Sequence, residues 1–138
     1  MINQMKRDFG TTGSIISYYA SFEIGLIERL AEDFPAEALF LRDLNNRMID
    51  LLDVFKNAWY YVPQMGKSAS IKDVLPALVP HLTYKGLSIN NGNLANKTFK
   101  SMIDGSFKGE VNETRNDLLE YCKLDTLAMV EIFLKLVN

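Results

Sequence analysis

One long helix is predicted by the stretch Thr114-Arg-Asn-Asp-Leu-Leu-Glu-Tyr-Cys-Lys-Leu-Asp-Thr-Leu-Ala-Met-Val-Glu-Ile-Phe-Leu-Lys-Leu136, which contains neither glycine nor proline. Thr114, followed three residues later by Asp117, resembles a capping box at its start. Apolar residues recur along the stretch at helical spacing. On a helical wheel one apolar stripe holds Leu118, Cys122, Met129, Ile132 and Leu136. The rest of the fold has to cover this stripe.

A carboxylate occupies the centre of the same stripe. Asp125 falls where a core residue would be expected, and Tyr121 lies one turn earlier on the same flank. Burying an unpaired ionised carboxylate is costly, so the position requires a hydrogen-bond donor, a cation or a metal. Asp125 and Tyr121 are therefore the first candidates for a functional site.

Length and composition indicate one globular domain over residues 1–138, with 48% hydrophobic and 23% charged residues. No apolar run is long enough to cross a bilayer and no signal pattern opens the chain, so we expect a cytoplasmic protein without a membrane partner. The single Cys122 cannot form an internal disulfide and is expected to be a small buried residue. The net charge of -2 argues against coating of nucleic acid by global charge and leaves a local basic strip open.

The most distinct strand is predicted for Ser14-Ile-Ile-Ser-Tyr-Tyr19, which is rich in β-branched and aromatic residues. A helix is expected from Ser21, as its cap, to Phe34, before Pro35. A lone strand cannot satisfy its own backbone groups. It has to pair with a strand elsewhere in the chain, with another copy, or with a segment that is not present.

Glu23 is a second acidic residue aligned with an apolar helical face, in the first turn after the predicted strand. Two interpretations are open for it. The carboxylate can stabilise the helix N-terminus through the macrodipole, which needs no function. It can also be a ligand at the carboxyl end of a strand, where open α/β sheets place their sites.

The middle of the chain is mainly helix-forming. The segment 47–52 contains either a short strand or a helix break, and a loop over residues 60–70 leads to a short helix that Ser70 caps and Pro76 limits. A further short helix is expected over residues 94–103. Core candidates between residues 36 and 61 are Leu39, Phe40, Leu44, Met48, Ile49, Leu52, Phe55 and Trp59. These elements amount to a helix-dominated α/β fold with one or two short strands and about five helices.

The loop before Ser70 carries groups that bind phosphate in other proteins. Gly66, Lys67, Ser68 and Ser70 offer backbone amides, hydroxyls and an ammonium group. Their spacing is not that of a P-loop, and a solvated turn is the alternative interpretation. His81, the only histidine, has no Cys or second His to form a metal site with it.

Four blocks carry a family resemblance: Gly13-Ser-Ile-Ile-Ser-Tyr-Tyr-Ala-Ser-Phe-Glu23, Arg47-Met-Ile-Asp-Leu51, Ser70-Ile-Lys-Asp-Val-Leu-Pro-Ala-Leu78 and Tyr121-Cys-Lys-Leu-Asp-Thr-Leu-Ala-Met129. In this order they resemble an uncharacterised bacterial family, domain of unknown function 2779. That family in turn resembles DnaQ-like 3'-5' exonucleases with a ribonuclease H-like fold, whose third motif is Tyr-x-x-x-Asp. By this resemblance Tyr121 and Asp125 match the third motif, and Glu23 stands where the second motif has its acid.

The resemblance implies cleavage of nucleic acid by two-metal phosphodiester hydrolysis, with Mg²⁺ or Mn²⁺ as cofactor. Asp125 and Glu23 would be metal ligands, and Tyr121 would orient the attacking water or the scissile phosphate. Substrate contacts are expected from four residues: Tyr19, where the family usually has Asn, and Lys67, Ser70 and Lys72.

One motif of the exonucleases is missing, because the chain contains no Asp-x-Glu pair. The 138 residues therefore look like the C-terminal portion of a ribonuclease H-like domain, and we expect the isolated chain to be inactive. An unpaired strand at 14–19 predicts a homodimer, or a dominantly helical monomer with one short strand region. The alternative function is a non-catalytic helical module that binds a protein or nucleic acid, in which Asp125 pairs with Arg47 or Lys72.

Overall fold

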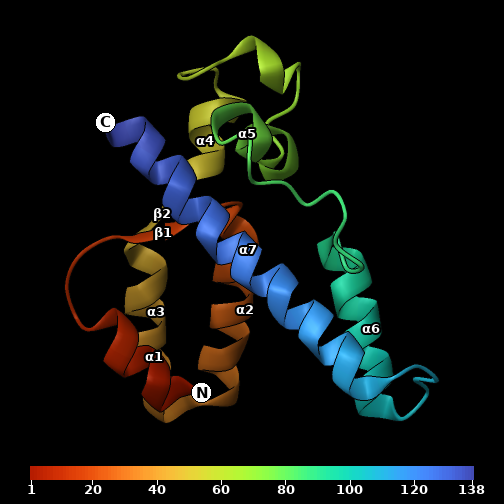
Figure 1. The fold of residues 1–138 in the computed structure, drawn as a ribbon. Coiled ribbons are helices and arrows are strands. Elements are labelled where there is room, and N and C mark those ends of the chain that lie inside the picture. Colours follow the sequence, from red (N-terminus) through yellow and green to blue (C-terminus); the bar gives the residue numbers. More distant parts are fainter. The chain divides into compact units, whose positions relative to one another are not determined.

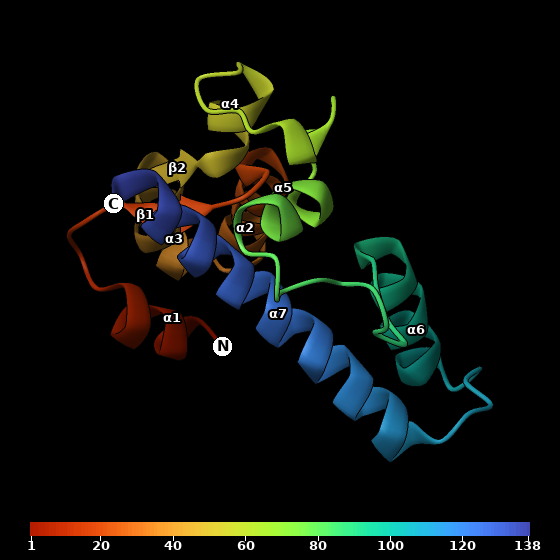
Figure 2. The ribbon, with the colours of Figure 1, turned by 45° about the horizontal axis from the view of Figure 1, so that its top comes forward.

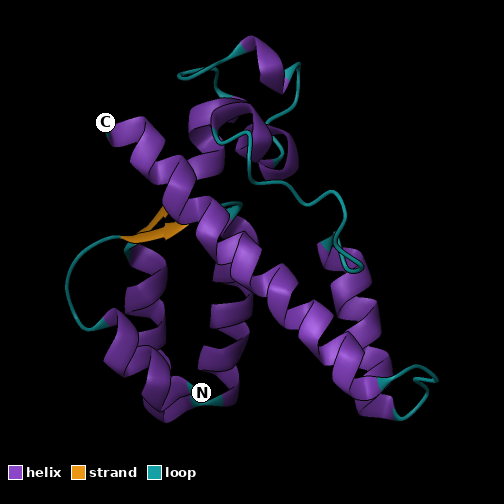
Figure 3. Cartoon of the chain, in the orientation of Figure 1, coloured by secondary structure: helices purple, strands orange, loops and turns teal.

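The computed structural model describes residues 1–138, which form several helices and one small parallel sheet (Figure 1, Figure 3). In chain order the elements are α1 (Ile2–Phe9), β1 (Ile15–Ser17), α2 (Ala20–Asp33), η1 (Pro35–Glu37), α3 (Ala38–Asn46), β2 (Met48–Asp50), α4 (Leu51–Lys56), η2 (Pro63–Met65), α5 (Ile71–Leu78), α6 (Gly92–Asp104) and α7 (Val111–Val137). The predicted helix-dominated α/β class is confirmed. There are more helices than the expected five, because a separate helix precedes β1 and a strand divides the middle region.

The chain packs as two compact units, Met1–Tyr61 and Val62–Asn138. The first holds α1 to α4 with both strands, and the second holds α5 to α7. Figure 2 shows the same elements from a second direction. The assignment of residues 1–138 to a single domain stays a prediction. None of the helices combines the length and the apolar character that a bilayer span requires.

The two strands pair in parallel, with Ile15 opposite Met48 and Ser17 opposite Asp50. The predicted strand at 14–19 is confirmed over its first part, and the open choice at 47–52 is decided in favour of a strand. The chain crosses from β1 to β2 through α2 and α3, as parallel strands require. The sheet has two strands only, so each strand is an edge.

The core of the first unit lies between α2 and α3, which run side by side (Figure 1, Figure 2). Its buried members are Ile27, Ala31, Leu41 and Leu44. Three expected core residues are exposed instead, namely Leu39 (91%), Ile49 (48%) and Trp59 (74%). The prediction for Leu39 is wrong because α3 begins at Ala38 and turns the side bearing Leu41 and Leu44 to the core.

The start of α2 is held by a distant carboxylate. Tyr19 precedes the helix in the left-handed conformation (φ 73°), and no side chain of its own segment caps it, so the predicted Ser21 cap is wrong. Asp50 accepts hydrogen bonds from the backbone N–H groups of Tyr19 (2.8 Å) and Ala20 (2.9 Å). It also accepts one from Leu52 (2.9 Å) as the N-cap of α4. One carboxylate therefore stabilises the starts of two helices.

Arg47 ties the segment before β1 to the end of α3. Its guanidinium donates hydrogen bonds to the carbonyl oxygens of Gly10 (3.1 Å), Thr12 (2.8 Å) and Gly13 (2.9 Å). Its Nε also lies 2.9 Å from a carboxylate oxygen of Asp43. The side chain is nearly buried, and its planar set of donors matches several acceptors at once.

In the second unit, α5 begins at the predicted cap, where the Ser70 hydroxyl accepts a hydrogen bond from the Lys72 N–H (3.4 Å). Pro76 lies inside α5 and does not end it. The long helix α7 begins at Val111, three residues before the predicted Thr114, and its first turn has no side-chain cap. The predicted capping box is therefore wrong. Buried residues of this unit are Met65, Val74, Leu75, Val79, Tyr84, Ile89, Tyr121, Ala128 and Ile132.

Candidate functional site

Asp125 lies on the inward face of α7. The buried residues of this helix are Tyr121, Ala128 and Ile132, which recur at spacings of seven and four, and Asp125 stands on the same stripe and is half-buried. Cys122, expected to be buried, is exposed. The buried side of α7 is the one that carries Tyr121. Because consecutive residues of a helix point in different directions around its axis, Cys122 points away from that side.

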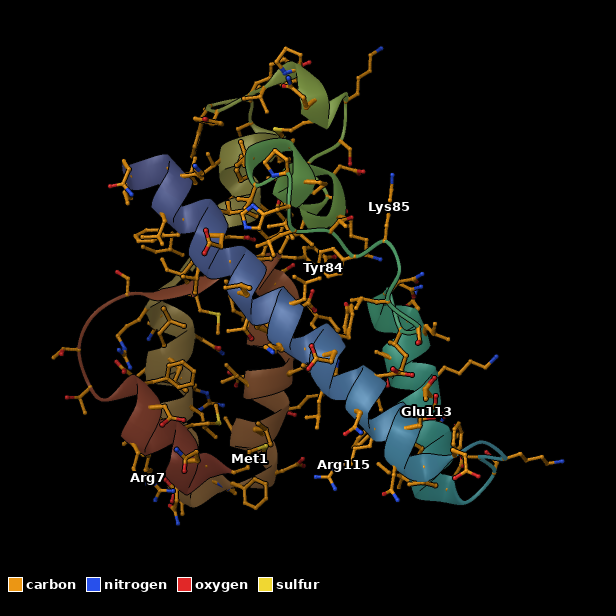
Figure 4. All side chains as sticks on the ribbon, in the orientation of Figure 1. Met1, Arg7, Tyr84, Lys85, Glu113 and Arg115 are labelled. Atoms are coloured by element: carbon orange, nitrogen blue, oxygen red, sulfur yellow. The ribbon has the colours of Figure 1, made fainter.

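The partner of Asp125 is a tyrosine from the segment between α5 and α6. The Tyr84 hydroxyl donates a hydrogen bond of 2.6 Å to Asp125 Oδ1, a length typical of a bond to a carboxylate. Tyr84 is 4% exposed, and its ring lies 6.1 Å from that of Tyr121, centroid to centroid. Its neighbour Lys85 extends away from the helix (Figure 4). Two phenol rings therefore stand beside one carboxylate.

The Tyr121 hydroxyl is a neutral donor in this setting. Burial, and after it the charge of Asp125, raise the pKa of Tyr121 well above its ordinary value. The hydroxyl faces the start of α6, because a Cβ added at Gly92 would lie 3.6 Å from Tyr121 Oη. Tyr121 and Asp125, which the sequence singled out together, thus interact directly.

Asp125 takes part in none of the ion pairs of the chain. The alternative interpretation paired it with Arg47 or Lys72. The Arg47 side chain is instead bonded to Asp43 and to carbonyl oxygens of its own unit, and Lys72 makes no ion pair. The hydrogen bond from Tyr84 takes the place of the expected cation.

Two further sequence candidates lie at the start of α2, in the first unit. Glu23 is exposed in the first turn of the helix, where the macrodipole favours a negative charge. Tyr19 is 57% exposed, and its left-handed backbone directs the chain from β1 into α2. Both therefore belong to the carboxyl end of β1, while Tyr121 and Asp125 belong to α7 in the second unit.

The remaining candidates cluster before α5. Lys67 is exposed and Lys72 half-buried, and neither makes an ion pair. The Ser68 hydroxyl accepts a hydrogen bond from the Ser70 N–H (3.1 Å), and the Ser70 hydroxyl caps the helix. Both hydroxyls thus accept hydrogen bonds from nearby backbone N–H groups. These bonds explain the turn, and no bound ligand is needed to explain it.

The donor set can be compared with the needs of Mg²⁺ or Mn²⁺, which prefer carboxylate oxygens. Asp125 has the right chemistry, and its Oδ2 is not used by the Tyr84 bond. No group of three or more His, Cys, Asp or Glu side chains that could hold a metal ion is found. The residues of this unit fit one ligand of a divalent site and do not form a complete one.

Sequence reasoning missed two residues that organise these regions. Tyr84 stands in a segment of mixed apolar and polar residues without a motif, so no pattern pointed to it. Asp50 did leave a signal, because an acidic residue directly before the apolar pair Leu51-Leu52 is a typical helix N-cap.

Comparison with known proteins gave one match. The family model described as "Domain of unknown function (DUF2779)" matches residues 1–70. No curated protein and no solved structure matches the chain. The matched part of the chain contains Tyr19, Glu23, Asp50 and Ser70, while Tyr121 and Asp125 lie beyond it.

Proposed function

The chain belongs to the DUF2779 family. We propose that it forms part of a metal-dependent 3'-5' exonuclease with a ribonuclease H-like fold. The family description names no activity. The argument for the proposal therefore comes from the residues and their chemistry.

The observation that carries the proposal is the setting of Asp125. A half-buried carboxylate stands on an inward helix face, one turn from Tyr121, in the Tyr-x-x-x-Asp spacing of the third exonuclease motif. Asp125 is hydrogen-bonded by the Tyr84 hydroxyl and also interacts with the Tyr121 hydroxyl, and it forms no ion pair with a cationic side chain. A partly buried carboxylate without a cationic partner is a favourable ligand for a divalent cation.

The arrangement of the first unit supports the same proposal. Parallel strands joined by a helical crossover are the building unit of α/β folds, and such folds place their sites at the carboxyl ends of the strands. β1 ends at Ser17, directly before Tyr19 and the first turn of α2 with Glu23. The acid of the second motif thus occupies the kind of position that the fold class uses for ligands.

In this proposal each residue has a stated task. Bound divalent ions would supply an activated water and stabilise the leaving oxygen. Asp125 would offer a ligand oxygen in the second unit and Glu23 one in the first, and the neutral Tyr121 hydroxyl would donate a hydrogen bond to a water or to a phosphate oxygen. Tyr19, Lys67, Ser70 and Lys72 contact the nucleic acid strand. Since the chain has no Asp-x-Glu pair, its own carboxylates do not complete a two-metal site.

A nuclease assay on the protein tests the proposal, with 5'-labelled single-stranded DNA and RNA and added Mn²⁺ or Mg²⁺. We expect stepwise shortening from the 3' end and its loss in the isosteric variant Asp125→Asn. The exposed Asp33, at the end of α2, offers a matched control, since Asp33→Asn removes the same charge elsewhere. Full activity of Asp125→Asn would exclude the proposed role.

One observation favours the second candidate, a non-catalytic module that binds a protein partner. The outward side of α7 is also apolar, with exposed fractions of 37%, 49%, 43% and 59% for Leu127, Val130, Leu134 and Val137. Their spacing of three and four places them on one stripe, which a soluble helix normally covers. In this case Leu134→Ser would abolish association with the partner and Asp125→Asn would not, whereas the nuclease proposal expects Asp125→Asn to be the damaging change.

A further inference from the structure

We propose that the exposed side of α6 is a binding surface for single-stranded nucleic acid. The surface contains none of the residues of the proposed nuclease site. It consists of Asn96, Lys97, Phe99, Lys100 and Ile103, which we name the α6 face. The inference shares its ligand class with the proposed function, and it depends neither on metal binding nor on cleavage.

The segment that contains α6 is basic. Residues 62–109 contain six lysines and two aspartates, with neither arginine nor glutamate, and so have a net charge of +4, whereas the whole chain has -2. Within α6, Lys97 and Lys100 are exposed and take part in none of the ion pairs. The only acidic residue of the helix is its last one, Asp104, which accepts a hydrogen bond from the Ser106 N–H (2.9 Å). The two lysine charges are therefore available to a polyanion.

Apolar side chains stand beside these lysines. No residue of α6 is buried, and the helix packs against α7 (Figure 1, Figure 2) through a half-buried side with Thr98 and Met102. On the exposed side, Phe99 is 56% and Ile103 is 71% exposed. Successive helix residues are rotated by about 100°, so Phe99, Ile103 and Lys100 fall within about 100° of the circumference. An aromatic ring and an ammonium group thus face the same region of solvent.

This combination is the one that proteins use to bind single strands without reading their sequence. Bases stack on exposed aromatic rings, while basic side chains follow the phosphates. Phe99 offers the ring and Lys97 and Lys100 offer the charges. The Asn96 amide can donate a hydrogen bond to a phosphate or to a base edge.

The composition of the α6 face also argues against a membrane surface as its ligand. A helix that lies in the membrane interface needs a continuous apolar face. The two apolar side chains of the α6 face, Phe99 and Ile103, are bordered by the Asn96 amide and the Lys100 ammonium group. A nucleic acid strand offers partners to all four side chains, whereas hydrocarbon offers partners only to the two apolar ones.

The test is a titration of this chain with a short fluorescein-labelled oligo(dT), followed by fluorescence anisotropy at low salt in the presence of EDTA. We expect Phe99→Ala to weaken binding by about tenfold, because one base loses its stacking partner. Phe34→Ala is the matched control, since Phe34 is similarly exposed (49%) and lies at the end of α2. Circular dichroism checks that both variants keep their helices, as expected for exposed positions.

The lysines are tested through the salt dependence of the same binding. Each phosphate contact to a single strand contributes roughly 0.7 to the slope of log affinity against log salt concentration. Lys100→Gln should therefore make this slope less steep by about 0.7. Lys135→Gln should leave it unchanged, because Lys135 is exposed in the last turn of α7 and α6 lies beside the first half of that helix (Figure 1, Figure 2).

A duplex of the same length and vesicles of anionic lipid complete the experiment. The bases of a duplex are already stacked on each other, so Phe99→Ala should not weaken its binding. Absence of oligo(dT) binding, equal affinities of Phe99→Ala and Phe34→Ala, or binding of the vesicles in place of the oligonucleotide would each overturn the inference. EDTA removes divalent ions, so the result is separate from the nuclease proposal. Binding that depends on Phe99 supports the α6 face even if Asp125→Asn keeps full nuclease activity.

Discussion

The carboxylate of Asp50 accepts a hydrogen bond of 2.8 Å from the backbone N–H of Tyr19, 31 positions earlier in the chain. The bond connects the carboxyl ends of the two strands, since Tyr19 follows β1 and Asp50 is the last residue of β2. It also fixes the left-handed conformation of Tyr19, which a tyrosine rarely adopts. The segment that holds Tyr19 and Glu23 is therefore positioned by a residue of the neighbouring strand.

Replacement of Asp50 by Ala should destabilise the chain by about 2–3 kcal/mol, because three backbone N–H groups lose their acceptor. Urea unfolding followed by circular dichroism measures the change. Asp53→Ala is the control, since Asp53 is exposed in the first turn of α4. If the two substitutions lower the free energy of unfolding equally, the effect comes from the loss of a negative charge near the start of α4 and not from the lost hydrogen bonds.

Replacement of Arg47 by Lys should lower the free energy of unfolding by about 1–2 kcal/mol, because an ammonium group cannot reach Asp43 and three carbonyl oxygens together. The residues that lose their tie are 10–13, so limited proteolysis should cut there first. Arg42→Lys is a suitable comparison, since Arg42 is exposed and bonds only to Glu28. If the rate of cleavage at residues 10–13 is the same in Arg47→Lys as in the unaltered chain, the Arg47 hydrogen bonds do not hold this segment in place.

Stability should fall at alkaline pH because of Tyr121. Its pKa is raised in the folded chain, so the unfolded chain loses the phenol proton first, near the ordinary value of about 10. The stabilisation is complete below this pH and is lost as the pH rises toward the folded pKa, at no more than about 1.4 kcal/mol per pH unit. Urea unfolding between pH 8 and about 11.5 measures the slope. Tyr121→Phe should flatten it and Tyr61→Phe should not; equal slopes in both variants would refute this origin.

The homodimer expected through residues 14–19 can be tested at one backbone group. The Ile15 N–H donates to the Arg47 carbonyl oxygen on the side of β2, so by alternation the Ile16 N–H points to the open edge of β1. If copies pair along this edge, Ile16→Pro removes the central donor and should raise the dimer dissociation constant by about tenfold. Sedimentation equilibrium gives that constant, with Ile16→Val as control. A concentration-independent monomer mass for the unaltered chain would exclude the dimer.

Much of the element order could be predicted from local chemistry. The β-branched and aromatic run after Gly13 predicted β1, and Pro35 predicted the end of α2. The errors concern features that distant residues decide. The true acceptor at the start of α2 comes from Asp50, so the nearby Ser21 was chosen wrongly. Leu39 was placed in the core because the first residue of α3, which sets the inward side, has no sequence signal of its own.

The candidate site was also predictable only where local sequence decides it. A carboxylate within an apolar helical stripe identified Asp125, and Tyr121 followed from its spacing of one turn. The Tyr84 hydroxyl bonds to Asp125, which lies 41 positions later in the chain, and no sequence motif contains both residues. Periodicity describes which way a side chain points along its own helix, and it contains no information on what a separate loop brings to that place.

The tie between Asp50 and Tyr19 has a consequence for the order of events during synthesis. The amide of Tyr19 has no acceptor until about thirty further residues have left the ribosome, and closing a loop of that size costs conformational entropy before any contact repays it. We therefore expect nascent chains arrested before β2 emerges to be digested readily between β1 and α2. Chains extended past α4 should become protected there in one step.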